Sequence, residues 1–234
     1  MIRKKGGWLI SNSNWSTEIR AVFLKEVQSE FRAKTGLITV GLLSLCTVVA
    51  LMLATFNLKL SGNLAAGLLW SAILFASVPS LPRTFLVEEE LGTGDLLRQW
   101  ARPHAVYWGK VLFNVLQGVL TGIALSVLFL GFSGMSVAIP WLFSLSLVGG
   151  TTALAGTVTL CGALVAKAAN RAALAGAISV PLLLPLVAIG VSSMRVALGS
   201  GVYLSGVLAT VGLYGYAAFT LSIAPWLFAS VWKS

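Results

Sequence analysis

Six long apolar stretches constrain this chain more than any other feature of its sequence. They run near Leu37–Phe56, Leu64–Leu81, Val111–Phe132, Ile139–Val165, Ala172–Val191 and Val202–Val231. A helix needs roughly 20 apolar residues to cross a hydrocarbon core of about 30 Å. None of the stretches alternates polar and apolar residues as barrel strands do, and lipid leaves no backbone group unpaired. The sequence therefore predicts an all-α, polytopic membrane protein with six transmembrane helices.

Composition excludes the main soluble classes. The 234 residues are 57% hydrophobic and only 10% charged, whereas a soluble domain carries about a quarter charged residues. A soluble globular enzyme is therefore not expected. The net charge of +9 is interpreted as membrane topology, so we expect no nucleic-acid partner and membrane lipid as the surrounding medium.

The basic residues predict which ends of the spans face the cytoplasm. Fourteen of the 16 Lys and Arg residues lie before span one, in the second and fourth connections or after span six, and only Lys59 and Arg195 lie on the other side. By the positive-inside rule both termini are cytoplasmic. The other side has short loops, near Asn57–Asn63, Ser133–Ala138 and Ser192–Gly201. Because no transit peptide rich in Arg and Ser is seen, the bacterial inner membrane is expected rather than an organelle. A copy encoded in an organelle, which needs no such peptide, stays an alternative.

The chain divides into three predicted parts. Residues 1–15 form an N-terminal extension, residues 16–34 an amphipathic helix, and residues 35–234 a six-helix membrane domain with a cytoplasmic loop at 83–110. The helix carries apolar residues at helical spacing: Ile19, Val22, Phe23, Val27 and Phe31. Such a helix lies in the headgroup layer with its apolar stripe down. It serves either as an anchor alone or as a contact for a partner.

The loop at 83–110 is the most polar segment between two spans. Four acidic residues fall within eight positions: Glu88, Glu89, Glu90 and Asp95. Gly92 and Gly94 are placed to end a helix that runs through Leu91. A charged helical hairpin of this kind suits docking to another protein, and the alternative is a solvated connector.

The motifs of independent catalysis are missing from the sequence. There is no Walker A, GxSxG or HExxH motif, and no Cys/His cluster. We therefore expect a non-enzymatic subunit. Gly118 and Gly122 form a GxxxG pair that permits close packing within the chain or across a homodimer. Pro181 and Pro185 predict a kink in span five.

Short motifs along the chain resemble a known family. The loop reads Glu90-Leu91-Gly92-Thr93-Gly94-Asp95-Leu96-Leu97, close to the pattern Glu-x-Gly-Thr-Leu-Glu-x-Leu. Pro103 precedes Gly109 and Lys110 at the start of span three, and Pro181 and Pro185 form a Pro-x(3)-Pro in span five. In order and placement these motifs resemble the permease subunits of ABC-2-type exporters, and within that group CcmB, the haem exporter protein B of cytochrome c maturation. The resemblance covers about Ile19 to Trp232.

The resemblance implies a function that depends on other chains. It implies a permease subunit in haem delivery or export for cytochrome c maturation, energised by a separate CcmA-like ATPase. The ATPase contact would comprise Glu88, Glu89, Glu90, Gly92, Thr93 and Asp95. CcmC-like and CcmD-like membrane proteins and a CcmE-like haem chaperone are the further implied partners. No resident cofactor is expected, and haem enters as a cargo of the complex.

Two alternatives stay open from the sequence. The first is an ABC-2-type permease that exports a lipid, a polysaccharide or a drug. The second is a membrane scaffold that organises a haem-handling complex without transporting anything.

Overall fold

The computed structural model describes residues 15–33, 35–56, 58–77, 92, 102–165 and 171–233. These residues form seven α-helices and contain no strand. The helices are α1 (Trp15–Ala33), α2 (Thr35–Ala54), α3 (Gly62–Ser77), α6 (Pro103–Ser133), α7 (Pro140–Val165), α8 (Arg171–Ala197) and α9 (Tyr203–Lys233). The prediction of an all-α membrane protein is confirmed.

Each predicted span overlaps one helix in the described part of the chain, but the helices differ in length. Four of them, α6, α7, α8 and α9, contain segments long and apolar enough to cross a membrane. The apolar segments of α2 and α3 are shorter, at Ile38–Ala54 and Gly62–Ser77. The count of six spans therefore stays a prediction.

Two helix boundaries differ by six residues or more from those that hydropathy alone predicts. Helix α6 begins at Pro103, eight residues before the apolar stretch, so Gly109 and Lys110 are helical. Proline suits this first position because its missing N–H would have no partner there. Helix α8 continues to Ala197, so the prediction of a loop from Ser192 is wrong over its first six residues. There the backbone groups find their partners within the helix.

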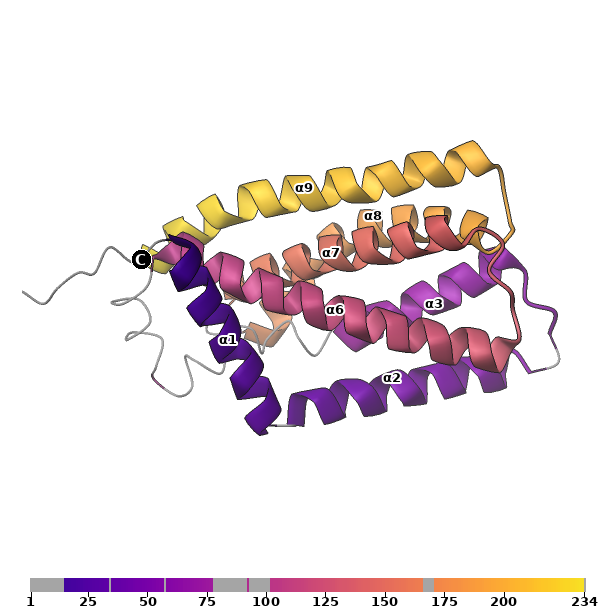
Figure 1. Ribbon diagram of the computed structural model, residues 1–234, viewed down its shortest axis with the longest axis horizontal. Coiled ribbons are helices and arrows are strands. Elements are labelled where there is room, and N and C mark those ends of the chain that lie inside the picture. Colours follow the sequence, from indigo (N-terminus) through magenta and orange to yellow (C-terminus); the bar gives the residue numbers. More distant parts are fainter. Residues whose placement is uncertain are drawn as a thin grey trace, which may run out of the picture.

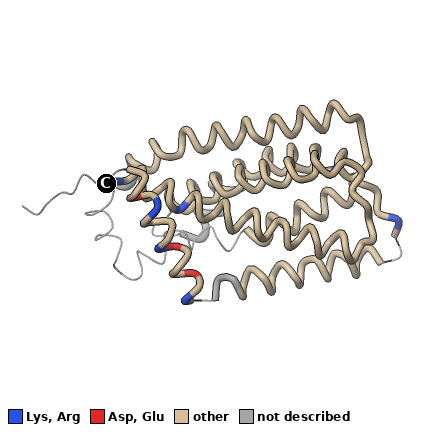
Figure 2. The backbone as a smooth tube through the Cα atoms, viewed as in Figure 1, with Lys and Arg blue, Asp and Glu red and all other residues tan. Residues whose placement is uncertain are grey.

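Helices α2, α3 and α6 to α9 run side by side along one axis, and α1 crosses one end of this bundle obliquely (Figure 1). Helix α7 contacts α6, α8 and α9 and is the central helix. In the most apolar 18-residue stretch of α7, 83% of the residues are buried, against 22% in the corresponding stretch of α6. Most of the charged residues that are described gather at the end where α1 lies (Figure 2). We call this the α1 end.

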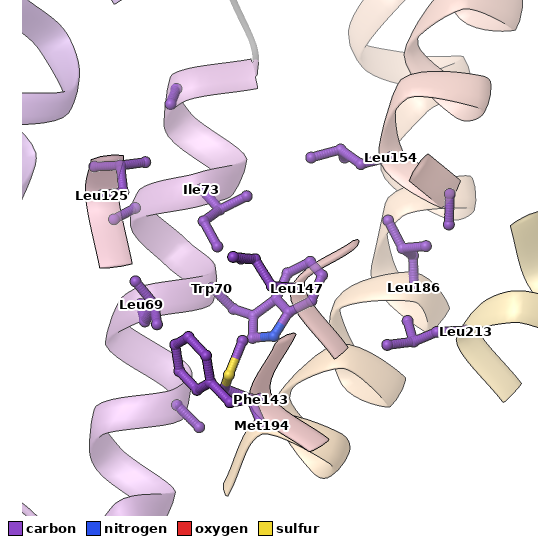
Figure 3. Packing of buried hydrophobic residues seen from close by; sticks show 14 of the residues in the cluster. Leu69, Trp70, Ile73, Leu125, Phe143, Leu147, Leu154, Leu186, Met194 and Leu213 are labelled. Atoms are coloured by element: carbon purple, nitrogen blue, oxygen red, sulfur yellow. The ribbon is translucent and has the colours of Figure 1, made fainter. Parts of the chain in front are cut away.

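The main core is built around the indole of Trp70, which is fully buried. Leu147, Phe143 and Met194 surround it from α7 and α8 (Figure 3). Gly150 of α7 and Gly190 of α8 lie directly against the ring, because a Cβ atom at either position would collide with it. These two glycines allow three helices to close around one large side chain. We call this cluster the Trp70 core.

The GxxxG pair of α6 packs inside the chain. A Cβ at Gly122 would lie 3.1 Å from Thr151 Cγ2 and 3.2 Å from Leu147 Cδ1, and one at Gly118 would lie 3.7 Å from Thr151. The small residues thus bring α6 close to α7, as such motifs do between membrane helices. A homodimer stays a prediction that this motif does not support.

Candidate functional site

Most residues of the expected ATPase contact lie outside the described part of the chain. Glu88, Glu89, Glu90, Thr93 and Asp95 are among them. Gly92 is described, and its φ of +66° is in the left-handed region. Glycine takes that conformation without steric cost and commonly follows the last turn of a helix. The role of these six residues in binding an ATPase remains a prediction.

The structure places the motif residues that follow the loop, Pro103, Gly109 and Lys110, in the first turns of α6, where α1 crosses it. A Cβ atom on Gly109 would lie 2.6 Å from the Cβ of Val22 and 3.1 Å from the carbonyl oxygen of Ile19. Real side chains do not come this close, so α1 can lie against α6 only because residue 109 has no side chain. Gly109 is therefore a helix-packing position.

A buried ion pair lies beside this close approach. Lys110 Nζ is 2.8 Å from Glu26 Oε1, and the side chains are only 2% and 17% exposed. Lys25 Nζ lies 3.0 Å from the same oxygen. Burial alone would raise the pKa of Glu26, but the two ammonium groups outweigh it and hold that pKa below its usual value of 4.5. Glu26 is thus held as a carboxylate, which compensates the buried charge of Lys110.

A second, weaker contact joins the same two segments. Arg102 Nε lies 3.7 Å from Glu18 Oε1, and the backbone N–H of Arg102 donates to Glu18 Oε2 at 3.4 Å. The Arg102 side chain is 65% exposed, so solvent screens this pair and we expect it to contribute little.

An apolar cluster surrounds the ion pair and extends the junction to α7 and α9. Its buried members are Val22, Val106, Tyr107, Val111, Leu160, Ala163, Ala224 and Phe228. The rings of Tyr107 and Phe228 lie 5.7 Å apart, and those of His104 and Trp226 lie 6.1 Å apart, edge to face. We call the contact of α1 with α6, formed by Val22, Glu26, Gly109, Lys110 and this cluster, the α1 junction. Helix α1 thus packs mainly on α6, and the cluster joins this contact to residues of α7 and α9.

Sequence reasoning missed Glu26, although a signal for it exists. Ile19, Val22, Phe23 and Glu26 are spaced at i, i+3, i+4 and i+7, so the glutamate continues the apolar stripe. A carboxylate in such a stripe requires a buried cation as its partner. Of the residues expected in the stripe, Phe31 is 68% exposed, whereas Val22 is buried against α6. Whether α1 also lies in the headgroup layer stays a prediction.

The two prolines of span five lie away from the α1 junction. Pro181 and Pro185 are both inside α8, which continues through them as one helix. The Tyr216 hydroxyl of α9 donates to the carbonyl oxygen of Leu182 at 2.7 Å. Proline removes a hydrogen-bond donor from the helix, and a neighbouring hydroxyl can satisfy carbonyls near such a break. The kink in span five stays a prediction.

The sequence of the chain matches the model of one protein family. A family model described as "CcmB protein" matches residues 17–233 of the chain. No curated protein sequence matches it. Within the described residues, no group of three or more His, Cys, Asp or Glu is placed to hold a metal ion.

Proposed function

The chain belongs to the CcmB family, the membrane component of the haem exporter of cytochrome c maturation, and from this we propose that it is a permease subunit driven by a separate ABC ATPase. The observation that carries the proposal is the family match across nearly the whole chain. The partners proposed with it are a CcmA-like ATPase, CcmC-like and CcmD-like membrane proteins, and a CcmE-like haem chaperone.

The α1 junction supports a route by which an ATPase could move the membrane helices. The acidic loop leads directly into Arg102 and the first turns of α6. Those turns hold Gly109 and Lys110 against α1, and the surrounding cluster reaches α7 and α9. A force on the loop would therefore reach four helices at once. This end would face the cytoplasm of a bacterial inner membrane, where ATP is available.

We propose that Glu88, Glu89, Glu90, Gly92, Thr93 and Asp95 dock the ATPase. Four of these six residues are acidic, so the partner should present basic residues to them. The glycine allows a sharp turn that would present the charges on one short segment. Haem is the proposed cargo of the complex.

Charge reversal tests the docking assignment. The double variant Glu89→Lys and Glu90→Lys should lose most of the co-purifying ATPase in mild detergent. Lys59→Glu, a charge reversal in the connection between α2 and α3, is the matched control and should keep it. Undiminished ATPase recovery with the double variant, at equal amounts of the tagged chain, would refute the assignment.

The scaffold and other-cargo alternatives give different results in cells. If the subunit serves an ATP-driven step, c-type cytochromes should be lost when the ATPase partner binds ATP but cannot hydrolyse it. Normal cytochrome levels under that condition would favour a scaffold. Normal levels after deletion of this chain would favour another cargo.

A further inference from the structure

A cleft with polar walls lies among α2, α3, α6 and α7. Its lining comprises Val40, Ala76, Ser77, Asn114, Gln117, Gly118, Thr121, Thr151, Leu154, Ala155 and Val158. Val40 lies near the start of α2, and Ser77 is the last residue of α3. The cleft therefore lies in the half of the bundle nearer the α1 end.

Helix α6 carries polar residues into this cleft, within a helix that is long and apolar enough to cross a membrane. Asn114, Gln117 and Thr121 recur at helical spacing on one face. Lys110 is the last charged residue of α6, and Gln117 lies about 10 Å beyond it along the helix axis. On the neighbouring faces Leu116 and Leu120 are 42% and 59% exposed, as expected for lipid contact. The helix thus separates a polar cleft from an apolar lipid surface.

Some polar groups of the cleft are satisfied by protein and two are not. Asn114 Nδ2 donates to Thr159 Oγ1 at 2.8 Å, and the hydroxyls of Ser77 and Thr151 donate to carbonyls of their own helices. Among the described residues, neither the Gln117 carboxamide nor the Thr121 hydroxyl has a protein partner. Leaving such groups unpaired in hydrocarbon costs several kcal/mol each, on the order of 2–7 for an amide or hydroxyl.

The size of the cleft fits a small polar occupant. The volume accessible to water in the cleft is about 30 Å³. A single buried water needs roughly 10–15 Å³ of such volume. There is room for about two waters, with the Gln117 and Thr121 groups as partners and hydroxyl oxygens as additional acceptors. An acyl chain would leave these groups unpaired.

We propose that this cleft is a hydration site, holding water inside the membrane-spanning part of the chain and connected to the α1 end. Water bound there satisfies Gln117 and Thr121 and gives the cytoplasm-facing half of α6 one hydrated side. The site is separate from the α1 junction and does not depend on which cargo the complex carries.

Cysteine accessibility tests this proposal with a matched pair on adjacent positions of α6. In a background with Cys46→Ala and Cys161→Ala, Thr121→Cys places a thiol in the cleft and Leu120→Cys places one toward lipid. A membrane-impermeant, positively charged methanethiosulfonate should modify the Thr121→Cys variant at least about tenfold faster than the Leu120→Cys variant. The reason is that only a hydrated thiol forms the reactive thiolate readily. Thr121→Cys is nearly isosteric, so folding should be retained.

The modification rate at position 121 should also depend on which end of the bundle the reagent reaches and on the polarity of the side chain at position 117. Modification at position 121 should be fast in vesicles that expose the α1 end to the reagent and slow in vesicles of the opposite orientation. Adding Gln117→Leu should slow it severalfold, because an apolar side chain removes a partner of the water. Equal rates at positions 120 and 121, fast modification only from the opposite end, or no effect of Gln117→Leu would each overturn the proposal.

Discussion

The Trp70 core and the α1 junction hold helices together by different means. In the Trp70 core, one indole fills the space left by Gly150 and Gly190, and its neighbours are apolar side chains. In the α1 junction, a glycine again permits the close approach, but the contact includes the buried pair of Lys110 and Glu26. The first contact depends on shape alone, whereas the second depends on shape and on charge.

This difference indicates which part of the molecule can move. Apolar packing around a fully buried ring is lost only when helices separate, at the cost of a cavity. An ion pair near the end of the bundle can exchange its partner for water with less disruption, because Glu26 is already partly exposed. We therefore expect the Trp70 core to be permanent and the α1 junction to be the contact that opens.

Removing the ring should have the largest effect. Trp70→Ala leaves a cavity between three helices and should destabilise the protein by about 3–5 kcal/mol, seen as a large drop in the melting temperature in detergent. Trp226→Ala removes a tryptophan that is 76% exposed and is the control. Equal melting temperatures for the two variants would show that the Trp70 core is not what stabilises the bundle.

Breaking the ion pair should release α1 and leave the bundle folded. Lys110→Met leaves Glu26 without its main partner and should weaken the junction by about 2–3 kcal/mol, less than the roughly 3–5 for a fully buried pair. Limited proteolysis should then cut near α1 while the remaining chain stays monodisperse. The double variant Lys110→Met with Glu26→Leu should recover most of the protection. A double variant as sensitive as the single one would contradict this account of the pair.

A methyl group at the crossing should have a smaller effect. Gly109→Ala forces Val22 away from α6 and should cost about 1–3 kcal/mol, in the range of overpacked cores. Gly118→Ala is the matched control on the same helix, because its Cβ would meet Thr151 at an ordinary 3.7 Å. The measurement is the protease sensitivity of α1. If α1 is equally resistant to the protease in both variants, the close approach at Gly109 is not required.

Acid should open the α1 junction and spare the Trp70 core. Since the pKa of Glu26 lies below its usual 4.5 in the docked state, its contribution is fully present above pH 4.5 and is lost as the pH falls through the lowered pKa. The effect should be smaller than that of Lys110→Met, because a protonated carboxyl still accepts a hydrogen bond. Tryptophan fluorescence and α1 proteolysis should be followed together from pH 6 to 3 on reconstituted protein. We expect α1 to become sensitive to the protease before the fluorescence reports any loss of packing. Glu26→Gln should abolish the pH response of α1.

The exposed pair should matter least. Arg102→Ala removes a side chain that is 65% exposed, and we expect a change of about 0–1 kcal/mol in the stability of the α1 junction. Measured by the same proteolysis, a loss as large as that of Lys110→Met would show that Glu18 and Arg102, not Glu26 and Lys110, hold α1.

The helices could be predicted from the sequence because their signals are local. Each apolar run overlaps a helix, and the amphipathic character predicted for residues 16–34 stays a prediction. The start of α6 was missed because Lys110 was counted with the loop. The burial of Lys110 depends on Glu26, which is 84 positions away in sequence. No local sequence pattern predicts that the two residues pair. The contacts of Trp70 with two glycines on other helices were unpredictable for the same reason.

The family assignment and the local motifs predicted the candidate site only in part. Gly109 and Lys110 were singled out as motif residues, yet their task of holding α1 follows only from the packing. That the acidic residues before them dock an ATPase remains a proposal. A single chain carries no record of the basic surface that would meet them.

Affinity purification of the tagged chain from its native membrane in mild detergent tests the central claim most directly. The account predicts that a small ABC ATPase and a CcmC-like membrane protein come with it, identified by mass spectrometry. Recovery of the intact, monodisperse chain with no ATPase would contradict the proposal that this protein is a permease subunit.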